Sequence, residues 1–261
     1  MAVGHDPLPN SSYGQLAELY NKYYAKDFPN TIDQPKLISG IPNLGVPQMA
    51  ALFEKNSVPT PRLWCIGEDE AYLVQLQDDW YARNWRGFPI EAEYPNFRKL
   101  APLFKDGLQH LTEYFESKEA AFIPRSCEIT YINHIPKPTD WNTLGEIEKV
   151  FTVWNMPEES IEFPGQPDQV TFESVYPLKA ANGEQCGHLI ITAQSAAKLE
   201  TGEELISLTL SARGVPLSAD NKGIIDFMNL GHEWIVKSFN NIITDEARKK
   251  WGELDGDEDY K

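Results

Sequence analysis

The sequence predicts an α+β fold made of two tandem helix-grip-like units, in each of which an antiparallel sheet is covered by a long helix. Strand-like segments followed by a long helical segment occur twice, over 62–118 and again over 169–243. This repeated order indicates a pseudo-duplication. In the last predicted strand, Ile206, Leu208 and Leu210 alternate with serine and threonine. Such alternation is typical of antiparallel strands with one covered face.

The chain of 261 residues is long enough for one large domain or two small ones. Residues 1–28 are predicted to form a polar tail, over 1–12, and an amphipathic helix. The first sheet-plus-helix unit is expected over 29–135 and the second over 136–252, with a proline-rich boundary at 136–144. Residues 253–261 are acidic and are predicted to be disordered.

Within the first unit, residues 29–47 carry four prolines and are predicted to form a loop. Pro102 lies inside the apolar stripe of the long helix, so the helix either starts there or is kinked. The elements expected here are a short strand at Lys36–Ile41, a short helix from Pro47, a hairpin of Arg62–Gly67 and Ala71–Trp85, a helix over 96–118 and a strand at Cys127–Ile135.

In the second unit, Asn182-Gly183 is the strongest signal for a tight hairpin turn. Thr244 is placed to cap the N-terminus of a closing helical turn. The elements expected here are a short helical stretch at 143–150, strands at 169–178, 187–193 and 204–213, and a long helix over 224–243.

The composition limits the partners. The chain carries 39 acidic and 23 basic residues, a formal net charge of −16. Because nucleic-acid binders neutralise phosphates with Lys and Arg, no direct binding to duplex nucleic acid is expected, and anionic membranes are disfavoured. No stretch approaches the ~18 apolar residues of a membrane helix. The acidic surface suits either a basic protein partner or plain solubility. The three scattered cysteines and the absence of a secretory signal indicate the cytoplasm.

One predicted strand carries unusual polar residues. Treated as one long strand, Ala71–Trp85 places Gln75, Gln77 and Arg83 on one face together with Asp79. Amides and a guanidinium in a row could line a polar cavity under a helix or one side of a partner-binding sheet. The alternative is the solvent face of an edge strand.

The end of that strand is the densest basic and aromatic cluster of the chain. Arg83 and Arg86 offer donors for a carboxylate or phosphate, and Trp85 offers a stacking surface. The alternative is an exposed arginine beside a core tryptophan.

Three further polar residues are candidate binding residues: Tyr131, Asn133 and His232. Strand alternation separates Cys127 from His134, which argues against a Cys–His nucleophile pair. His232 lacks the second histidine of a helical zinc motif, so it either faces a cavity at the sheet or points to solvent. No catalytic residue, no metal site and no cofactor is therefore expected.

Taken together, several strings of the sequence resemble those of a sporadically distributed, uncharacterised bacterial protein family of similar length. The resemblance implies a cytoplasmic bacterial protein carried on mobile or defence-associated loci, and it supplies no catalytic residues. The strings are Pro61-Arg62-Leu63-Trp64, 73–77, Asn84-Trp85-Arg86, Tyr94-Pro95, 127–135 and Gly231-His232-Glu233, followed by Phe239 and Trp251.

Two functions are compatible with these observations. The first is a non-catalytic interaction or accessory protein of a bacterial conflict or phage-defence system, acting through protein–protein binding. The alternative is a small-molecule-binding domain or enzyme that uses a cavity between the sheet and the long helices. A large cavity lined by the candidate residues favours the second function. A filled core with an exposed aromatic patch favours the first.

Overall fold

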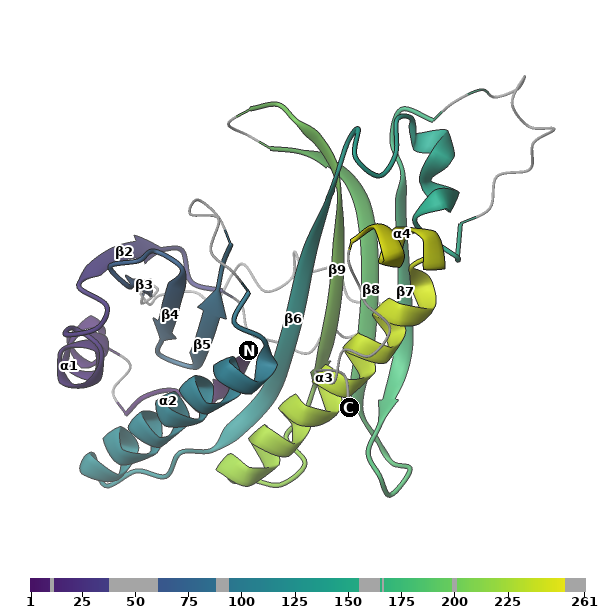
Figure 1. The fold of residues 1–261 in the computed structure, drawn as a ribbon. Helices are drawn as coiled ribbons and strands as arrows, with labels where there is room; N and C mark the ends of the chain where they lie inside the picture. Colours follow the sequence, from purple (N-terminus) through teal and green to yellow (C-terminus); the bar gives the residue numbers. More distant parts are fainter. Residues whose placement is uncertain are drawn as a thin grey trace, which may run out of the picture. The chain divides into compact units, whose positions relative to one another are not determined.

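The structure, a computed structural model, describes residues 1–9, 12–37, 61–87, 94–154, 165, 167–198 and 201–251. The fold is α+β, with one large antiparallel sheet and a few helices, as the sequence predicts (Figure 1). The described strands follow the order β2-β3-β4-β5-β1-β6-β9-β8-β7. The chain divides into two compact units: unit 1 is Met1–Glu128 with Gly214–Asn229, and unit 2 is Ile129–Arg213 with Leu230–Lys261.

The described residues of unit 1 form five whole strands and the first residues of a sixth. They are β1 (Ala2–His5), β2 (Asn30–Gln34), β3 (Arg62–Ile66), β4 (Tyr72–Gln77), β5 (Trp80–Trp85) and β6 (Pro124–Pro136). Neighbouring strands from β2 to β5 pair antiparallel. The last predicted strand of the hairpin is in fact two strands, because Asp78 and Asp79 form a tight turn between β4 and β5.

The prediction of a polar tail is wrong for Ala2–His5. These residues form β1, which pairs with β5 through Val3 and Tyr81 and with β6 through Val3 and Cys127. All four residues are buried. The prediction of a loop is wrong for Asn30–Gln34, which forms β2 against β3. Both strands are short, and their stability depends on distant partners rather than on a local apolar pattern.

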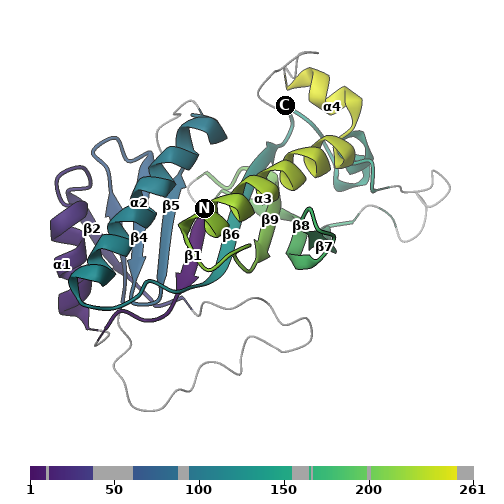
Figure 2. The same ribbon diagram turned by 90° about the horizontal axis from the view of Figure 1, so that it is seen from below.

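Among the described residues of unit 1, α1 (Tyr13–Tyr23) and α2 (Phe97–Ser117) lie over one face of its sheet (Figure 2), and the unit also holds the start of α3 (Asn221–Ile242). The side chain of Asn96 caps α2 by accepting a hydrogen bond from the backbone N–H of Lys99, 3.2 Å away. The helix runs through Pro102, which is exposed, so neither a start at this proline nor a break is needed. The predicted stripe of Phe104, Leu108 and Leu111 is buried.

Helix α2 also joins α1 through its last turns. The hydroxyl of Tyr114 donates to the backbone carbonyl of Gln15 and to Glu18, and Lys118 forms an ion pair with the same glutamate. These contacts hold the two helices side by side above the sheet.

In unit 2, the part of the chain that the structure describes forms the remainder of β6 and three strands at the predicted positions: β7 (Thr171–Lys179), β8 (Gln185–Ala197) and β9 (Glu204–Gly214). The β7–β8 turn follows the prediction, with Gly183 at φ +84° and its N–H donating to the carbonyl of Ala180. The alternation predicted for β9 is confirmed over Ile206, Leu208 and Leu210, which are buried, with half-buried polar residues between them. It is wrong at Ser211, which is buried and bonds to the hydroxyl of Thr130.

The helices of unit 2 complete its core. They are η2 (Leu144–Lys149), the part of α3 (Asn221–Ile242) that follows Asn229, and α4 (Asp245–Lys250). Helix α3 lies across β6 and β9 at Gly231, where an added Cβ would come within 2.6 Å of Ile129 and 2.9 Å of Ala212. The predicted cap is confirmed, since Thr244 Oγ1 accepts from the N–H of Ala247.

Three sequence predictions fall on residues outside those described. They are most of the strand at Lys36–Ile41, the short helix from Pro47 and the disordered tail at 253–261.

Candidate functional site

The polar residues of β4 and β5 do not share one face. Val74 pairs with Arg83 and Gln75 pairs with Ala82. Because directly paired residues project to the same side of a sheet, Arg83 lies on the opposite face from Gln75 and Gln77. The prediction of one shared face is wrong, because the turn at Asp78 reverses the alternation that a single continuous strand would keep.

Gln75 and Gln77 bind other parts of the protein. The amide of Gln75 accepts from Trp64 Nε1 at 3.1 Å and donates to Asn84 Oδ1 at 2.9 Å. Gln77 is 1% exposed, accepts from the N–H of Leu37 at 2.7 Å and donates to its carbonyl at 2.8 Å. Both side chains therefore have internal partners for their amide oxygens and nitrogens.

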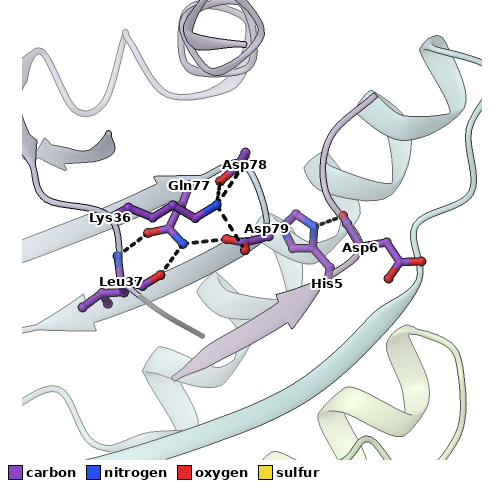
Figure 3. Close-up of polar contacts among 7 residues, drawn as sticks. All are labelled: His5, Asp6, Lys36, Leu37, Gln77, Asp78 and Asp79. Carbon is purple, nitrogen blue, oxygen red and sulfur yellow. Dashed lines mark hydrogen bonds and ion pairs between the residues drawn. The ribbon is translucent and has the colours of Figure 1, made fainter. Parts of the chain in front are cut away.

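The turn after Gln77 is held by charge (Figure 3). Lys36 Nζ lies 2.8 Å from Asp78 Oδ1 and 3.4 Å from Asp79 Oδ2. Burial opposes the charge of Lys36, but hydrogen bonding and attraction to the two aspartates outweigh it and raise the lysine pKa. The backbone N–H of His5 donates to the carbonyl of Asp79 at 2.9 Å, which ties β1 to the same turn.

The rest of the basic and aromatic cluster has local contacts. The ring of Trp85 meets that of Tyr94 edge-on, with 5.2 Å between centroids. Arg86 Nε donates to the carbonyl of Glu70 at 2.7 Å and thereby bridges the β3–β4 turn. From this cluster, Arg83 lines the cavity described below.

The remaining three candidates belong to unit 2. Tyr131 on β6 and His232 on α3 are joined by a hydrogen bond of 3.0 Å between Oη and Nδ1. Burial lowers the pKa of His232. Asn133, two positions further along β6, is half-buried. The structure thus brings together Tyr131 and His232, while Arg83 belongs to a separate site in unit 1.

That site is a cavity of about 540 Å³ in unit 1. It opens to solvent and is bordered by the end of α1 and the residues after it, the β3–β4 turn, β5 and α2. The lining side chains and glycines are Tyr23, Tyr24, Lys26, Asp27, Phe28, Gly67, Glu68, Asp69, Tyr72, Arg83, Leu103, Asp106, Gly107 and His110. The volume falls in the range of small-molecule sites.

Arg83 is a half-buried lining residue of the cavity. Its guanidinium carbon stands 4.8 Å from the ring centroid of the buried Phe28, and its Nε is buried without a hydrogen-bond partner among the described residues. The aromatic face stabilises the cation and fixes its plane. The remaining donors of the guanidinium fork are available to an occupant.

Two buried tyrosine hydroxyls stand beside Arg83. Tyr24 and Tyr81 interact with each other, and Tyr81 also interacts with Arg83, yet neither hydroxyl reaches full hydrogen-bond geometry with a described residue. Burial raises the pKa of Tyr81 to about 12 and that of Tyr24 well above its usual value. Both phenols are therefore neutral donors at physiological pH.

Gly107 allows Tyr81 to take this position. A Cβ at Gly107 would lie 1.7 Å from the Tyr81 hydroxyl. Only glycine at this point of α2 leaves the phenol room to reach under the helix.

One wall of the cavity is formed by stacked rings. His110 stacks on Tyr23 with 4.6 Å between centroids at 19°, and Tyr24 meets the same imidazole edge-on. His110 Nδ1 and the Tyr23 hydroxyl are buried without a partner among the described residues. Burial lowers the pKa of His110, and Arg83 adds to the lowering, against the opposing effect of Glu113 and Asp106. The imidazole is accordingly neutral at pH 7.

The rim of the cavity is charged and exposed. It carries one lysine and four carboxylates: Lys26, Asp27, Glu68, Asp69 and Asp106. Asp69 also organises its own turn, since its Oδ1 accepts from the N–H groups of Ala71 and Tyr72. The site therefore has a cationic and phenolic interior and a mainly acidic mouth.

Of the cavity residues, Arg83 was predictable from the sequence, whereas the aromatic residues and His110 were not identified. A signal existed, because Leu103, Gly107 and His110 recur at helical spacing on the cavity side of α2. The adjacent Tyr23 and Tyr24 at the end of α1 gave no comparable indication, since their role depends on α2 packing beside them.

Among the described residues, no group of three or more His, Cys, Asp or Glu side chains could hold a metal ion. Nor is any helix in those parts of the chain both long and apolar enough to span a membrane.

Comparison with known proteins gives no match to a protein-family model, to a curated protein or to a solved structure. The resemblance to a bacterial family stays a prediction.

Proposed function

We propose that unit 1 binds a small organic molecule in the cavity between α1, α2 and the sheet. The observation that carries the proposal is a cavity of about 540 Å³ lined by the half-buried side chain of Arg83 and by aromatic rings. Beside it lie Arg83 Nε, His110 Nδ1 and the Tyr23 hydroxyl, which are buried and have no hydrogen-bond partner among the described residues. Leaving such an atom unpaired costs about 1–3 kcal/mol. An occupant regains that free energy where small shifts of the surrounding side chains let it reach these atoms.

The cavity also supplies apolar contact. Phe28, Tyr23 and Tyr24 present ring surface to it, and Leu103 adds an aliphatic side chain. Small-molecule sites combine apolar walls with a few placed polar groups. This combination favours the alternative considered from the sequence, a small-molecule-binding domain or enzyme.

A screen with an occluding variant tests the proposal. A panel of small acids, amines and neutral aromatic compounds is added at millimolar concentration, and binding is measured by thermal shift and by amide chemical shifts. Leu103→Trp, at a half-buried lining residue of α2, should abolish the response. Leu100→Trp is the matched control, because Leu100 is half-buried on the same helix but does not line the cavity. The absence of hits, or hits that Leu103→Trp retains, would refute the proposal.

Binding to a protein partner is the second candidate. It is supported by Ile132, which is 63% exposed on β6 although Ile129 and Ile135 on the same strand are buried. Ile132→Lys should release a partner that the unmodified chain retains on purification, and retention by both would exclude this surface. A role in bacterial defence, a basic partner and a cytoplasmic location stay predictions.

We also propose that the two units arose by duplication of one helix-grip-like unit. Support comes from the order of elements, since three antiparallel strands precede a long helix in both β3-β4-β5-α2 and β7-β8-β9-α3. Superposition of residues 60–135 on 145–245 tests this, and unlike connections between equivalent strands would contradict it.

A further inference from the structure

We infer that the cavity of unit 1 takes a small aromatic zwitterion, with a carboxylate held by Arg83 and an ammonium group held by the acidic rim. The inference rests on the proposed function and adds the chemical class of the ligand.

The carboxylate is assigned from the surroundings of Arg83. Arg83 is half-buried, and one face of its guanidinium is covered by Phe28. A planar guanidinium with free edge donors matches a planar carboxylate, which accepts two parallel hydrogen bonds. The buried, neutral hydroxyls of Tyr24 and Tyr81 stand beside Arg83 and lack full hydrogen-bond partners among the described residues.

The ammonium group is assigned from the mouth of the cavity. Four carboxylates and one lysine stand exposed at the rim, and Asp106 lies close enough to raise the pKa of His110. This negative rim disfavours a dicarboxylic acid, which would place a second negative charge at the mouth. It favours a molecule whose positive end remains at the mouth while its acid end reaches Arg83.

The part of the ligand between its two charged groups is assigned from the aromatic walls of the cavity. The stacked rings of Tyr23 and His110 and the ring of Phe28 offer flat apolar surface. A second aromatic ring packs against such surfaces with a gain beyond simple burial. An aromatic spacer therefore fits better than a flexible polar chain.

Three probes of one shape separate the charges. They are para-aminomethylbenzoate, which carries both charges, para-toluate, which carries only the acid, and para-methylbenzylamine, which carries only the amine. We expect the zwitterion to bind to the full chain at least about tenfold more tightly than either single-charge probe, as measured by calorimetry. All binding should be lost in Leu103→Trp and retained in Leu100→Trp.

Variants assign each charge to its residue. Arg83→Gln should weaken para-aminomethylbenzoate and para-toluate by about ten- to hundredfold and leave para-methylbenzylamine unchanged. Asp106→Asn should weaken only the two amines, by about two- to fivefold, because the residue is exposed. If Arg83→Gln fails to fold, Arg83→Lys keeps the charge without the fork and should still weaken the two acids.

The outcomes distinguish failure of the inferred ligand class from failure of the proposed small-molecule site. Two results would overturn the zwitterion as the ligand class while leaving the cavity as the site. They are tighter binding of para-methylbenzylamine than of para-aminomethylbenzoate, and binding of para-toluate that Arg83→Gln leaves unchanged. The same holds if none of the three probes binds but another compound of the panel binds and is lost in Leu103→Trp. If nothing binds, both the ligand class and the proposed function fail.

Discussion

Gly107 offers a sharp test of how α2 fits over the site. An added Cβ would lie 1.7 Å from the hydroxyl oxygen of Tyr81 and 2.4 Å from the ring carbon that bears it. Tyr81 is fully buried and stacks on Phe104 with 5.6 Å between centroids, so its ring has little room to move. Gly107→Ala therefore forces either the ring or the helix to shift.

The expected magnitude follows from two opposing effects. Replacing a helical glycine by alanine stabilises a helix by about 1 kcal/mol. Overpacking a filled core costs about 1–3 kcal/mol, and a contact as short as this one lies at the upper end. Gly107→Ala should therefore lower the free energy of unfolding by about 1–2 kcal/mol, as measured by urea denaturation followed by circular dichroism.

A double-mutant cycle identifies the cause. Tyr81→Phe removes the hydroxyl that meets the new methyl group, and it should be nearly neutral alone because that hydroxyl has no full partner. The double variant should then be more stable than the sum of the single effects by at least about 1 kcal/mol. Gly14→Ala, whose Cβ would have only an ordinary contact of 3.8 Å to Ser12, is the control and should be neutral or stabilising. A stabilised Gly107→Ala variant, or additive single effects, would refute the reasoning.

Three further predictions concern other parts of the protein. Gln77→Leu should lower the free energy of unfolding by about 1–3 kcal/mol and speed amide exchange at Leu37, because both hydrogen bonds between Gln77 and the Leu37 backbone are lost. Gln109→Leu, at an exposed position, should have neither effect. Burial lowers the pKa of His5 below its ordinary 6.5, so below pH 6.5 the unfolded chain binds more protons than the folded one, and the free energy of unfolding should fall as pH drops through that value. Urea titrations at a series of pH values should show a flatter fall for His5→Gln; an unchanged dependence of the free energy of unfolding on pH would contradict this. The thiols of Cys65, Cys127 and Cys186 are all buried, so a chromogenic disulfide reagent should react slowly with the native protein but rapidly with all three thiols in denaturant. Rapid reaction of the reagent with the native protein would show that burial does not protect the thiols.

The fold was predictable from the sequence where local patterns decide the structure. The stripe of Phe104, Leu108 and Leu111 defines α2, and Asn182-Gly183 defines the β7–β8 turn. Strand β1 could not be found in this way. It has only four residues, and its stability comes from pairing with β5 and β6, which are distant in the sequence.

The candidate site was predictable only in part, for a related reason. Arg83 stands out in the sequence as a cation beside aromatic residues, but its observed neighbour Phe28 comes from a different segment. The two-residue turn at Asp78 also exchanged the faces of β5, which separated Arg83 from Gln75 and Gln77. A one-residue error in the assumed turn is enough to move every side chain of a strand to the other face.

The place of β1 in the sheet sets the order in which unit 1 can assemble. Ala2–His5 pairs on one side with β5 and on the other with residues from Pro124 onward in β6. During synthesis β1 leaves the ribosome more than a hundred residues before its second neighbour, β6. Pairings of such high sequence separation slow folding, because loop closure precedes the gain from contact. A nascent chain that has not yet released β6 thus carries an unpaired strand edge, which is the point at which chaperone binding or aggregation would act.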